Sequence, residues 1–264
     1  MKRTISMLLC SLLVAGALSM SASVALSQYA PPGVNPTHFW TYKLQTLIQI
    51  PRPVFAADQF YPNGVPLTVD RLDRLVNWVS KNGSPIVPDT LLHYTWWNVQ
   101  PKLPTPRVVR VINQFGDYIV NVQNLEFMLV PAWKNQPQPT QPVANHYLCY
   151  RATGFPPPPF GVSLIDEWRE DNQHPQELEY LCNPCRKEHA GSIYPVVDTK
   201  THLALFRLPV LSDLFTPFIQ DQFFMGTVPV RQSPYEYLLV PSNKFDIATP
   251  ARTGSWGRMK TIYR

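Results

Sequence analysis

The sequence predicts an all-β protein built from four tandem repeats, and two observations support this fold class. Three sequence landmarks recur in the same order four times, and each has the composition of a strand or a turn. The 264 residues also include 29 prolines, which disfavour long helices because proline removes a backbone donor and blocks helix interiors. We expect the four β repeats to pair into two small sandwich- or barrel-like domains.

The first landmark is a histidine followed four residues later by an aromatic residue. Its start-to-start spacings are 55, 53 and 56 residues. The segment is rich in aromatic and β-branched residues, and its first, third and fifth residues share one face of a strand. The histidines that open the repeats are His38, His93, His146 and His202.

The second landmark, some twenty residues later, is an acid or amide, then Gln or Glu, then an aromatic residue. This pattern suits a turn in which the first side chain accepts backbone hydrogen bonds. Acid–base catalysis is disfavoured, because a catalytic site needs one asymmetric constellation and one copy has an amide in place of the carboxylate. The first residues of this landmark are Asp58, Asn113, Asp166 and Asp221.

The third landmark is an apolar strand that ends in a lysine, 41 to 43 residues after the histidine. We expect these lysines to be solvated strand ends. The closing lysines are Lys81, Lys134, Lys187 and Lys244.

Linkers that follow the closing lysines suggest the domain boundaries. The middle linker, 135–145, is the richest in proline and glutamine, which is typical of an interdomain spacer. We therefore expect one domain at 38–134 and a second at 146–244. A single four-fold ring is the alternative, because the other linkers have similar lengths.

The first 27 residues resemble a secretory signal peptide, with a basic start, a short apolar run and a small-residue cleavage site between Ser27 and Gln28. A lipoprotein anchor at Cys10 is disfavoured, because bulky Leu9 lies where a small residue is needed. No other apolar stretch approaches the roughly 20 residues of a spanning helix. We expect a secreted or periplasmic protein without a membrane span, beginning with an extension at 28–37.

The charge of the chain gives little indication of a partner. After removal of the signal peptide, 21 Lys and Arg face 18 Asp and Glu, and no basic stripe suggests nucleic-acid binding. The basic tail, 245–264, is interpreted as a solvated terminus, with adhesion to an anionic surface as the alternative.

The remaining cysteines are Cys149, Cys182 and Cys185. The first two occupy positions that both become non-cysteine in the other repeats, so we predict a Cys149–Cys182 disulfide in an oxidising compartment. Cys185 is then a free thiol or an intermolecular partner. The equivalent pairs are Thr41 with Val76, Trp96 with Leu129, and Leu205 with Leu239.

A redox motif and a metal site are less well supported by the sequence than structural roles for the same cysteines and histidines. Cys182 and Cys185 have the spacing of a thioredoxin-type motif, but that motif works at a helix start, and the intervening proline and strand context argue against it. The four histidines invite a zinc hypothesis, yet structural histidines are expected. Cys185, His189 and His174 form only a weak ligand cluster, so we predict no metal and no cofactor.

The opening and closing segments of the third and fourth repeats, His146 to Arg151, Tyr180 to Lys187 and Tyr237 to Lys244, resemble a bacterial secreted repeat family of uncharacterised function. Its repeats open His-Leu-x-Cys-Tyr-Lys, pass Asp-Gln-Phe-Gly and close Leu-Cys-Val-Pro-Ser-x-Lys. The resemblance covers roughly residues 38–244 and implies a disulfide between the two cysteine positions. This chain keeps that cysteine pair in one repeat only.

The sequence contains no nucleophile elbow, zinc-protease helix, phosphate-binding loop or dinucleotide fingerprint. We therefore expect a non-catalytic exported protein with a structural, surface or ligand-binding role, whose partner is an extracytoplasmic protein or a glycan. The alternative is a cell-envelope hydrolase with a site between repeat pairs. Such an enzyme would gather non-repeating polar residues, namely Glu170, Asp171, His174 and Glu177.

Overall fold

The computed structural model describes residues 38–83, 92–134, 144–209, 216–231, 233 and 235–247. All helices and strands that could be assigned in these ranges are strands, and none is a helix, so the all-β prediction is confirmed. None of the described segments is a helix of the length and apolarity that a membrane crossing needs. The expectations for the signal peptide, the 28–37 extension, most of the 135–145 linker and most of the basic tail concern residues outside these ranges.

The described strands range in length from 3 to 20 residues. Those of the first half are β1 (His38–Ala57), β2 (Val65–Lys81), β3 (Leu92–Gln100), β4 (Pro104–Asn113) and β5 (Gly116–Lys134). Those of the second half are β6 (His146–Thr153), β7 (Val162–Ile165), β8 (Glu170–Gln173), β9 (Leu178–His189), β10 (Ser192–Tyr194), β11 (His202–Leu208), β12 (Phe218–Gln220), β13 (Met225–Thr227) and β14 (Glu236–Asp246).

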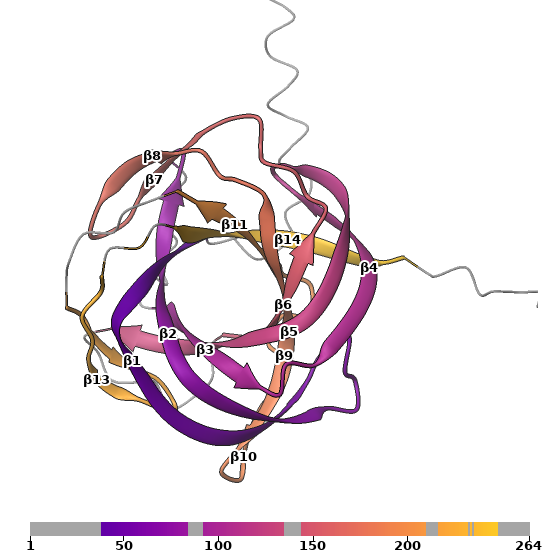
Figure 1. Ribbon diagram of the computed structural model, residues 1–264, viewed down its shortest axis with the longest axis vertical. Helices are drawn as coiled ribbons and strands as arrows, with labels where there is room; N and C mark the ends of the chain where they lie inside the picture. Colours follow the sequence, from indigo (N-terminus) through magenta and orange to yellow (C-terminus); the bar gives the residue numbers. More distant parts are fainter. Residues whose placement is uncertain are drawn as a thin grey trace, which may run out of the picture.

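Eight of these strands form a closed antiparallel barrel (Figure 1). The order around the barrel is β1–β2–β3–β5–β6–β9–β11–β14, and β14 pairs with β1 to complete the circuit. Each strand therefore has a backbone partner on both sides. Closure removes the open sheet edges that would otherwise expose unpaired backbone groups.

The barrel differs from the expectation of two separate domains. β5 of segment 38–134 pairs with β6 of segment 146–244, and β14 pairs with β1 across the other boundary. Either segment alone would leave a sheet of four barrel strands with an open edge on each side, whereas pairing across the boundaries satisfies both edges. The two halves thus share one sheet, as in the single-ring alternative.

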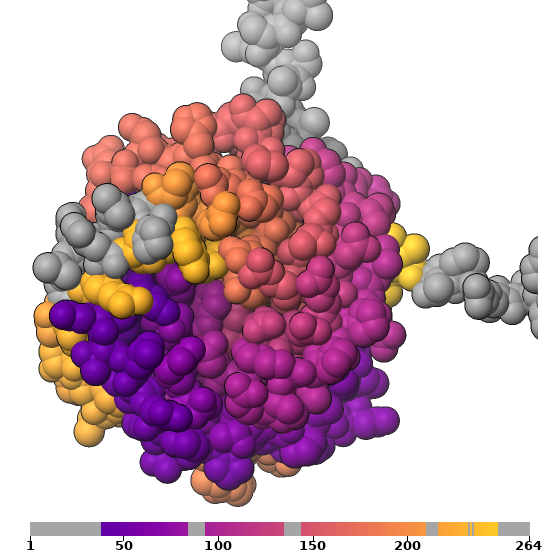
Figure 2. All heavy atoms as spheres, in the orientation of Figure 1, coloured from indigo at the N-terminus to yellow at the C-terminus, as the bar shows by residue number. Residues whose placement is uncertain are grey.

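A compact apolar cluster fills the interior of the barrel and contains at least one residue from each of its eight strands. Figure 2 shows that atoms occupy the centre of the ring seen in Figure 1. The middle of the interior consists of four cross-strand pairs that correspond to the positions matched in the sequence. These pairs are Thr41–Val76, Trp96–Leu129, Cys149–Cys182 and Leu205–Leu239.

A second, larger core surrounds the barrel, because four peripheral arms cover its outer face. Each arm pairs with the end of one of the barrel strands that carry a closing lysine, which we call the closing strands: β2, β5, β9 and β14. The outer half of β1 pairs with β9, β4 with β14, β7 with β2, and β12 with β5. The fifth residues of the opening strands face this outer core; they are Tyr42, Trp97, Tyr150 and Phe206.

The predicted disulfide between Cys149 and Cys182 is confirmed, and it joins β6 to β9 inside the barrel. Cys185 is a buried free thiol. It belongs to the outer core, on the opposite face of β9 from the disulfide. This orientation separates the thiol from the disulfide and argues against exchange between them.

Candidate functional site

The residues of the second landmark lie in tight turns at the tips of the arms. Oδ1 of Asp58 accepts hydrogen bonds from the backbone amides of Phe60 and Tyr61, both at 2.9 Å. Asp166 and Asp221 each accept two backbone bonds in the same way, and Asn113 accepts one.

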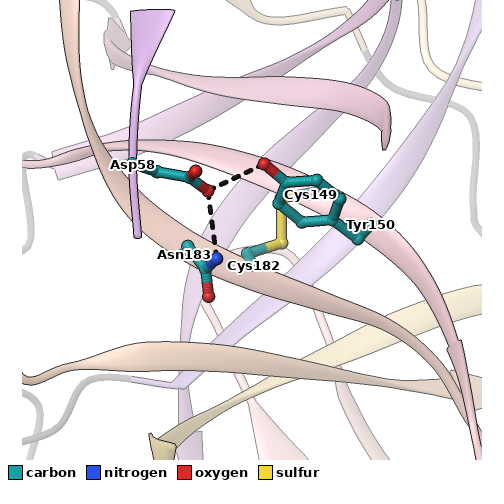
Figure 3. The surroundings of a disulfide bond; sticks show 5 residues. All are labelled: Asp58, Cys149, Tyr150, Cys182 and Asn183. Atoms are coloured by element: carbon teal, nitrogen blue, oxygen red, sulfur yellow. Dashed lines mark hydrogen bonds between the residues drawn. A yellow bond between two sulfur atoms is a disulfide. The ribbon is translucent and has the colours of Figure 1, made fainter. Parts of the chain in front are cut away.

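The second oxygen of the same carboxylates attaches each arm to a distant strand of the barrel. Oδ2 of Asp58 accepts from the Tyr150 hydroxyl at 2.8 Å and the Asn183 amide at 3.0 Å, beside the disulfide (Figure 3). Oδ2 of Asp166 reciprocally accepts from the Tyr42 hydroxyl at 2.5 Å and the Asn77 amide at 3.0 Å.

The other two arms form an equivalent pair. Asp221 accepts from the Trp97 indole at 2.7 Å, and the Asn113 amide donates to the Ser242 hydroxyl at 3.0 Å. Burial raises the pKa of Asp58 and of Asp221, although their hydrogen bonds act in the opposite direction. These side chains hold the arms in place, and their hydrogen-bonding capacity is taken up by the fold.

The closing lysines are not solvated strand ends, which corrects the expectation from the sequence. The arms cover the strand ends, and each ammonium group lies over the aromatic ring of a second landmark. Lys187 is fully buried, and burial lowers its pKa to about 7. The ammonium-to-centroid distances are 5.7 Å for Lys81 and Phe115, 4.1 Å for Lys134 and Trp168, 4.5 Å for Lys187 and Phe223, and 4.4 Å for Lys244 and Phe60.

The four opening histidines are buried beside these lysines. The Gln114 amide donates to Nε2 of His38, and His146 donates to Oε1 of Gln222 at 3.2 Å. Burial lowers the pKa of His38 to about 3, with the nearby ammonium group adding to the effect. Across the described ranges, His, Cys, Asp and Glu side chains do not gather in groups of three that could hold a metal ion.

Two further recurring positions escaped the sequence analysis. The first lies five residues after each histidine and is basic or an amide; its members are Lys43, Asn98, Arg151 and Arg207. The second lies eight residues before each closing lysine and is acidic; its members are Asp73, Glu126, Glu179 and Glu236. Their fixed distances from the landmarks were the signal that could have identified them.

Two of these basic residues contact a recurring acid, Lys43 with Asp73 and Arg151 with Glu179, at one end of the barrel, which we call the mouth. The basic residues continue the interior face of the opening strands at the end opposite the histidines. Asp73 and Glu179 are extra residues in β-bulges, since the register skips each of them. A bulge places two successive side chains on nearly the same face, so Glu179 can approach the mouth together with Tyr180.

Aromatic side chains form the floor of the mouth. Trp96 stacks on Phe127 with ring centroids 3.4 Å apart and makes an edge contact with Tyr180 at 5.5 Å. The Arg74 guanidinium lies 5.6 Å from the Trp96 ring and 5.1 Å from the Tyr237 ring. The floor therefore combines apolar ring faces with one buried cation.

Charged side chains at the rim of the mouth lie in ion pairs. Arg151 contacts Glu179 at 2.5 Å, and Arg207 contacts Glu177 at 3.1 Å. The Arg151 and Arg207 side chains are 40% and 37% exposed, so both guanidinium groups are accessible from solvent.

The acid of the fourth segment behaves differently. Glu236 is fully buried, and its carboxyl group lies near the Trp40 indole and the Arg74 and Arg169 guanidinium groups. Burial raises its pKa to about 8, against the opposing effect of the Arg74 and Arg169 guanidinium groups. A buried carboxyl group in this setting is neutral over much of the physiological pH range.

The polar residues expected of a hydrolase are not brought together. Glu177 pairs with Arg207, and Asp171 pairs with Arg169 at 2.5 Å. Among the described contacts, none joins Glu170, Asp171, His174 and Glu177 to one another. His189, which the sequence placed in a weak metal-ligand cluster, donates a hydrogen bond to the Pro53 carbonyl.

The described surface also has open grooves. One, of about 590 Å³, lies between the β1–β2 arm and the β9–β10 turn and is lined by Pro53, Gln100 and His189 among others. Two more, of about 530 and 410 Å³, flank Gln59. The four residues expected of a hydrolase are absent from the linings of these described grooves.

Comparisons with protein-family models, with curated proteins and with solved structures found no match for this chain.

Proposed function

We propose that this protein is an exported, non-catalytic binding scaffold. The observation that carries the proposal is the use of its recurring polar residues. The recurring Asp, Asn and Lys side chains mainly contact other parts of the fold, and the three recurring carboxylates accept hydrogen bonds with both oxygens. Groups committed in this way are not available to transfer protons to a substrate.

We further propose that the scaffold consists of four copies of one unit arranged around the barrel axis. The closing lysines support this arrangement, because each lies over the aromatic ring of the next segment, and Lys244 returns to Phe60 of the first. The arms add support, because each pairs with the closing strand two segments away.

Export is also part of the proposal. The Cys149–Cys182 disulfide is compatible with an oxidising compartment, and the signal-like start of the sequence agrees with it. N-terminal sequencing of the protein recovered from outside the cytoplasm should give a start at Gln28. A full-length chain retained in the cytoplasm with reduced cysteines would contradict export.

The non-catalytic role is tested by incubating the purified protein with insoluble cell-envelope polymers, such as peptidoglycan. We expect the protein to sediment with a polymer and to release no soluble fragments or new reducing ends. Protein-dependent release of fragments, above that of a heat-denatured control, would instead establish the hydrolase alternative.

A further inference from the structure

The two ends of the barrel interior differ in chemistry. At the histidine end, Phe39, Tyr94 and Tyr147 pack edge to face across the interior, with centroid distances of 5.2 and 5.9 Å. Three of the cross-strand partners in this layer are prolines, Pro131, Pro184 and Pro241. This apolar packing closes one end, whereas the mouth carries polar groups; barrel mouths are common places for ligand sites.

Three buried polar atoms at the mouth have no hydrogen-bond partner within the described part of the chain. They are Nη1 of Arg74, Nε1 of Trp96 and Oε2 of Glu179. Arg74 and Trp96 are each 4% exposed. An unpaired buried polar group costs about 1–3 kcal/mol, so a molecule that supplies the missing partners binds favourably.

The types of these atoms define the chemistry of such a molecule. Arg74 and Trp96 offer two donors, and Glu179 offers an acceptor. A hydroxyl group both accepts and donates, so one or two hydroxyl groups satisfy all three atoms.

The charges at the mouth favour a neutral ligand. Arg151 is paired with Glu179, Arg207 with Glu177, and both Lys43 and Arg74 with Asp73. An anion would have to compete with these carboxylates, and a cation with the guanidinium groups. Neutral polar groups can instead form hydrogen bonds to the outer atoms of the existing pairs.

The aromatic side chains at the mouth provide stacking surfaces. Tyr180 is partly exposed and stands edge-on to Trp96. Tyr235 is 39% exposed and lies over the Arg74 guanidinium at 5.6 Å, so it offers an accessible ring beside the buried floor. Aromatic rings of this kind pack against the apolar faces of sugar rings.

We infer that the mouth of the barrel binds a short neutral glycan through Arg74, Trp96, Arg151, Glu179, Tyr180 and Tyr235. This inference rests on the proposed binding function and names its ligand class and its site.

The test is calorimetric titration of the chain from residue 28 to 264 with chitotriose, cellotriose and maltotriose, and with a sulfated tetrasaccharide as the anionic probe. We expect saturable binding of at least one neutral probe below about 10 mM, and weaker binding of the sulfated one. Tyr180→Ala removes a stacking surface and Arg151→Gln an accessible donor, so each should weaken binding by about three- to tenfold.

Phe245→Ala is the matched control, because Phe245 is a 51% exposed aromatic residue one position after the closing lysine Lys244, at the opposite end. It should leave affinity unchanged within about twofold. Thermal unfolding of each variant excludes loss of fold as the cause. No neutral binding, tighter binding of the sulfated probe, or equal affinities for all variants would overturn the glycan site. Release of new reducing ends from any probe would instead contradict the non-catalytic function.

Discussion

Buried ionisable residues determine how this fold responds to pH. The opening histidines and closing lysines are desolvated beside one another, and Glu236 is buried near the Trp40 indole and the Arg74 and Arg169 guanidinium groups. Desolvation favours the uncharged form of each group. The stability of the fold therefore depends on pH through both acidic and basic side chains. Substituting one side chain at a time distinguishes their contributions.

Glu236→Gln should remove one of these dependences. The folded pKa of about 8 lies above the ordinary value of 4.5, so the folded state holds this proton more tightly than the unfolded state. The wild-type protein thus loses stability from this group as pH rises from 4.5 to 8. We expect Glu236→Gln to gain about 3–5 kcal/mol relative to wild type between pH 5 and pH 8.

Urea unfolding of both proteins at pH 5, 6.5 and 8 measures this gain. The comparison isolates Glu236, because the other groups titrate equally in both proteins. A difference in free energy of unfolding that stays constant with pH would show that the carboxyl group is ionised in the fold.

His202 should give the opposite trend. Its folded pKa of about 4 lies below the ordinary 6.5, so protons bind more readily to the unfolded state. The stabilising effect is complete above pH 6.5 and is lost as pH falls toward 4. We expect the stability of wild type relative to His202→Gln to fall by about 3 kcal/mol between pH 7 and pH 4. Guanidinium unfolding at these pH values measures the change, and a fall of the same size in both proteins would refute it.

At the scale of the strands, one matched cross-strand position in the barrel interior is filled by different residue pairs. Cys149–Cys182 is covalent, while Thr41–Val76 and Leu205–Leu239 fill the same interior layer without a bond. The disulfide therefore adds stability to one strand pair, β6 with β9, without being required for the shape of the interior.

Replacing both cysteines by valine, Cys149→Val with Cys182→Val, should preserve the fold and lower its stability. The bond closes a loop with a sequence separation of 33 residues, for which chain entropy gives about 3–4 kcal/mol. Chemical denaturation should show this loss, and Cys185→Val, which leaves the bond intact, should change stability by less than about 1 kcal/mol. A double variant as stable as wild type would mean that the cross-link contributes nothing.

At the scale of the molecule, closure makes both halves necessary. The interior cluster takes residues from all eight barrel strands, and the arms of each half pair with closing strands of the other. Separation of the halves would expose both apolar cores and leave open strand edges.

Segments 38–134 and 146–247 expressed separately should therefore not unfold cooperatively, whereas 38–247 should do so in one transition by circular dichroism. A circular permutant that joins residue 247 to His38 through a second copy of 135–145, and opens the chain within the original 135–145, should remain folded. Cooperative unfolding of either isolated half would contradict the closed barrel.

The sequence by itself determined the strand class and the cysteine pairing. Cys149 and Cys182 were predicted as partners because their matched positions change together, and cross-strand neighbours share one local environment. The acids at Asp73 and Glu179 were missed, because a bulge reverses the face that strand alternation assigns to a side chain.

Only the tertiary structure decided between two domains and one closed barrel. A linker rich in proline and glutamine is compatible with either, whereas the pairing of β14 with β1 is a contact between the two ends of the described chain. The closing lysines were expected in solvent because their burial depends on arms contributed by other segments. Local sequence specifies strands and turns, but contacts between distant segments determine which of their polar ends remain in water.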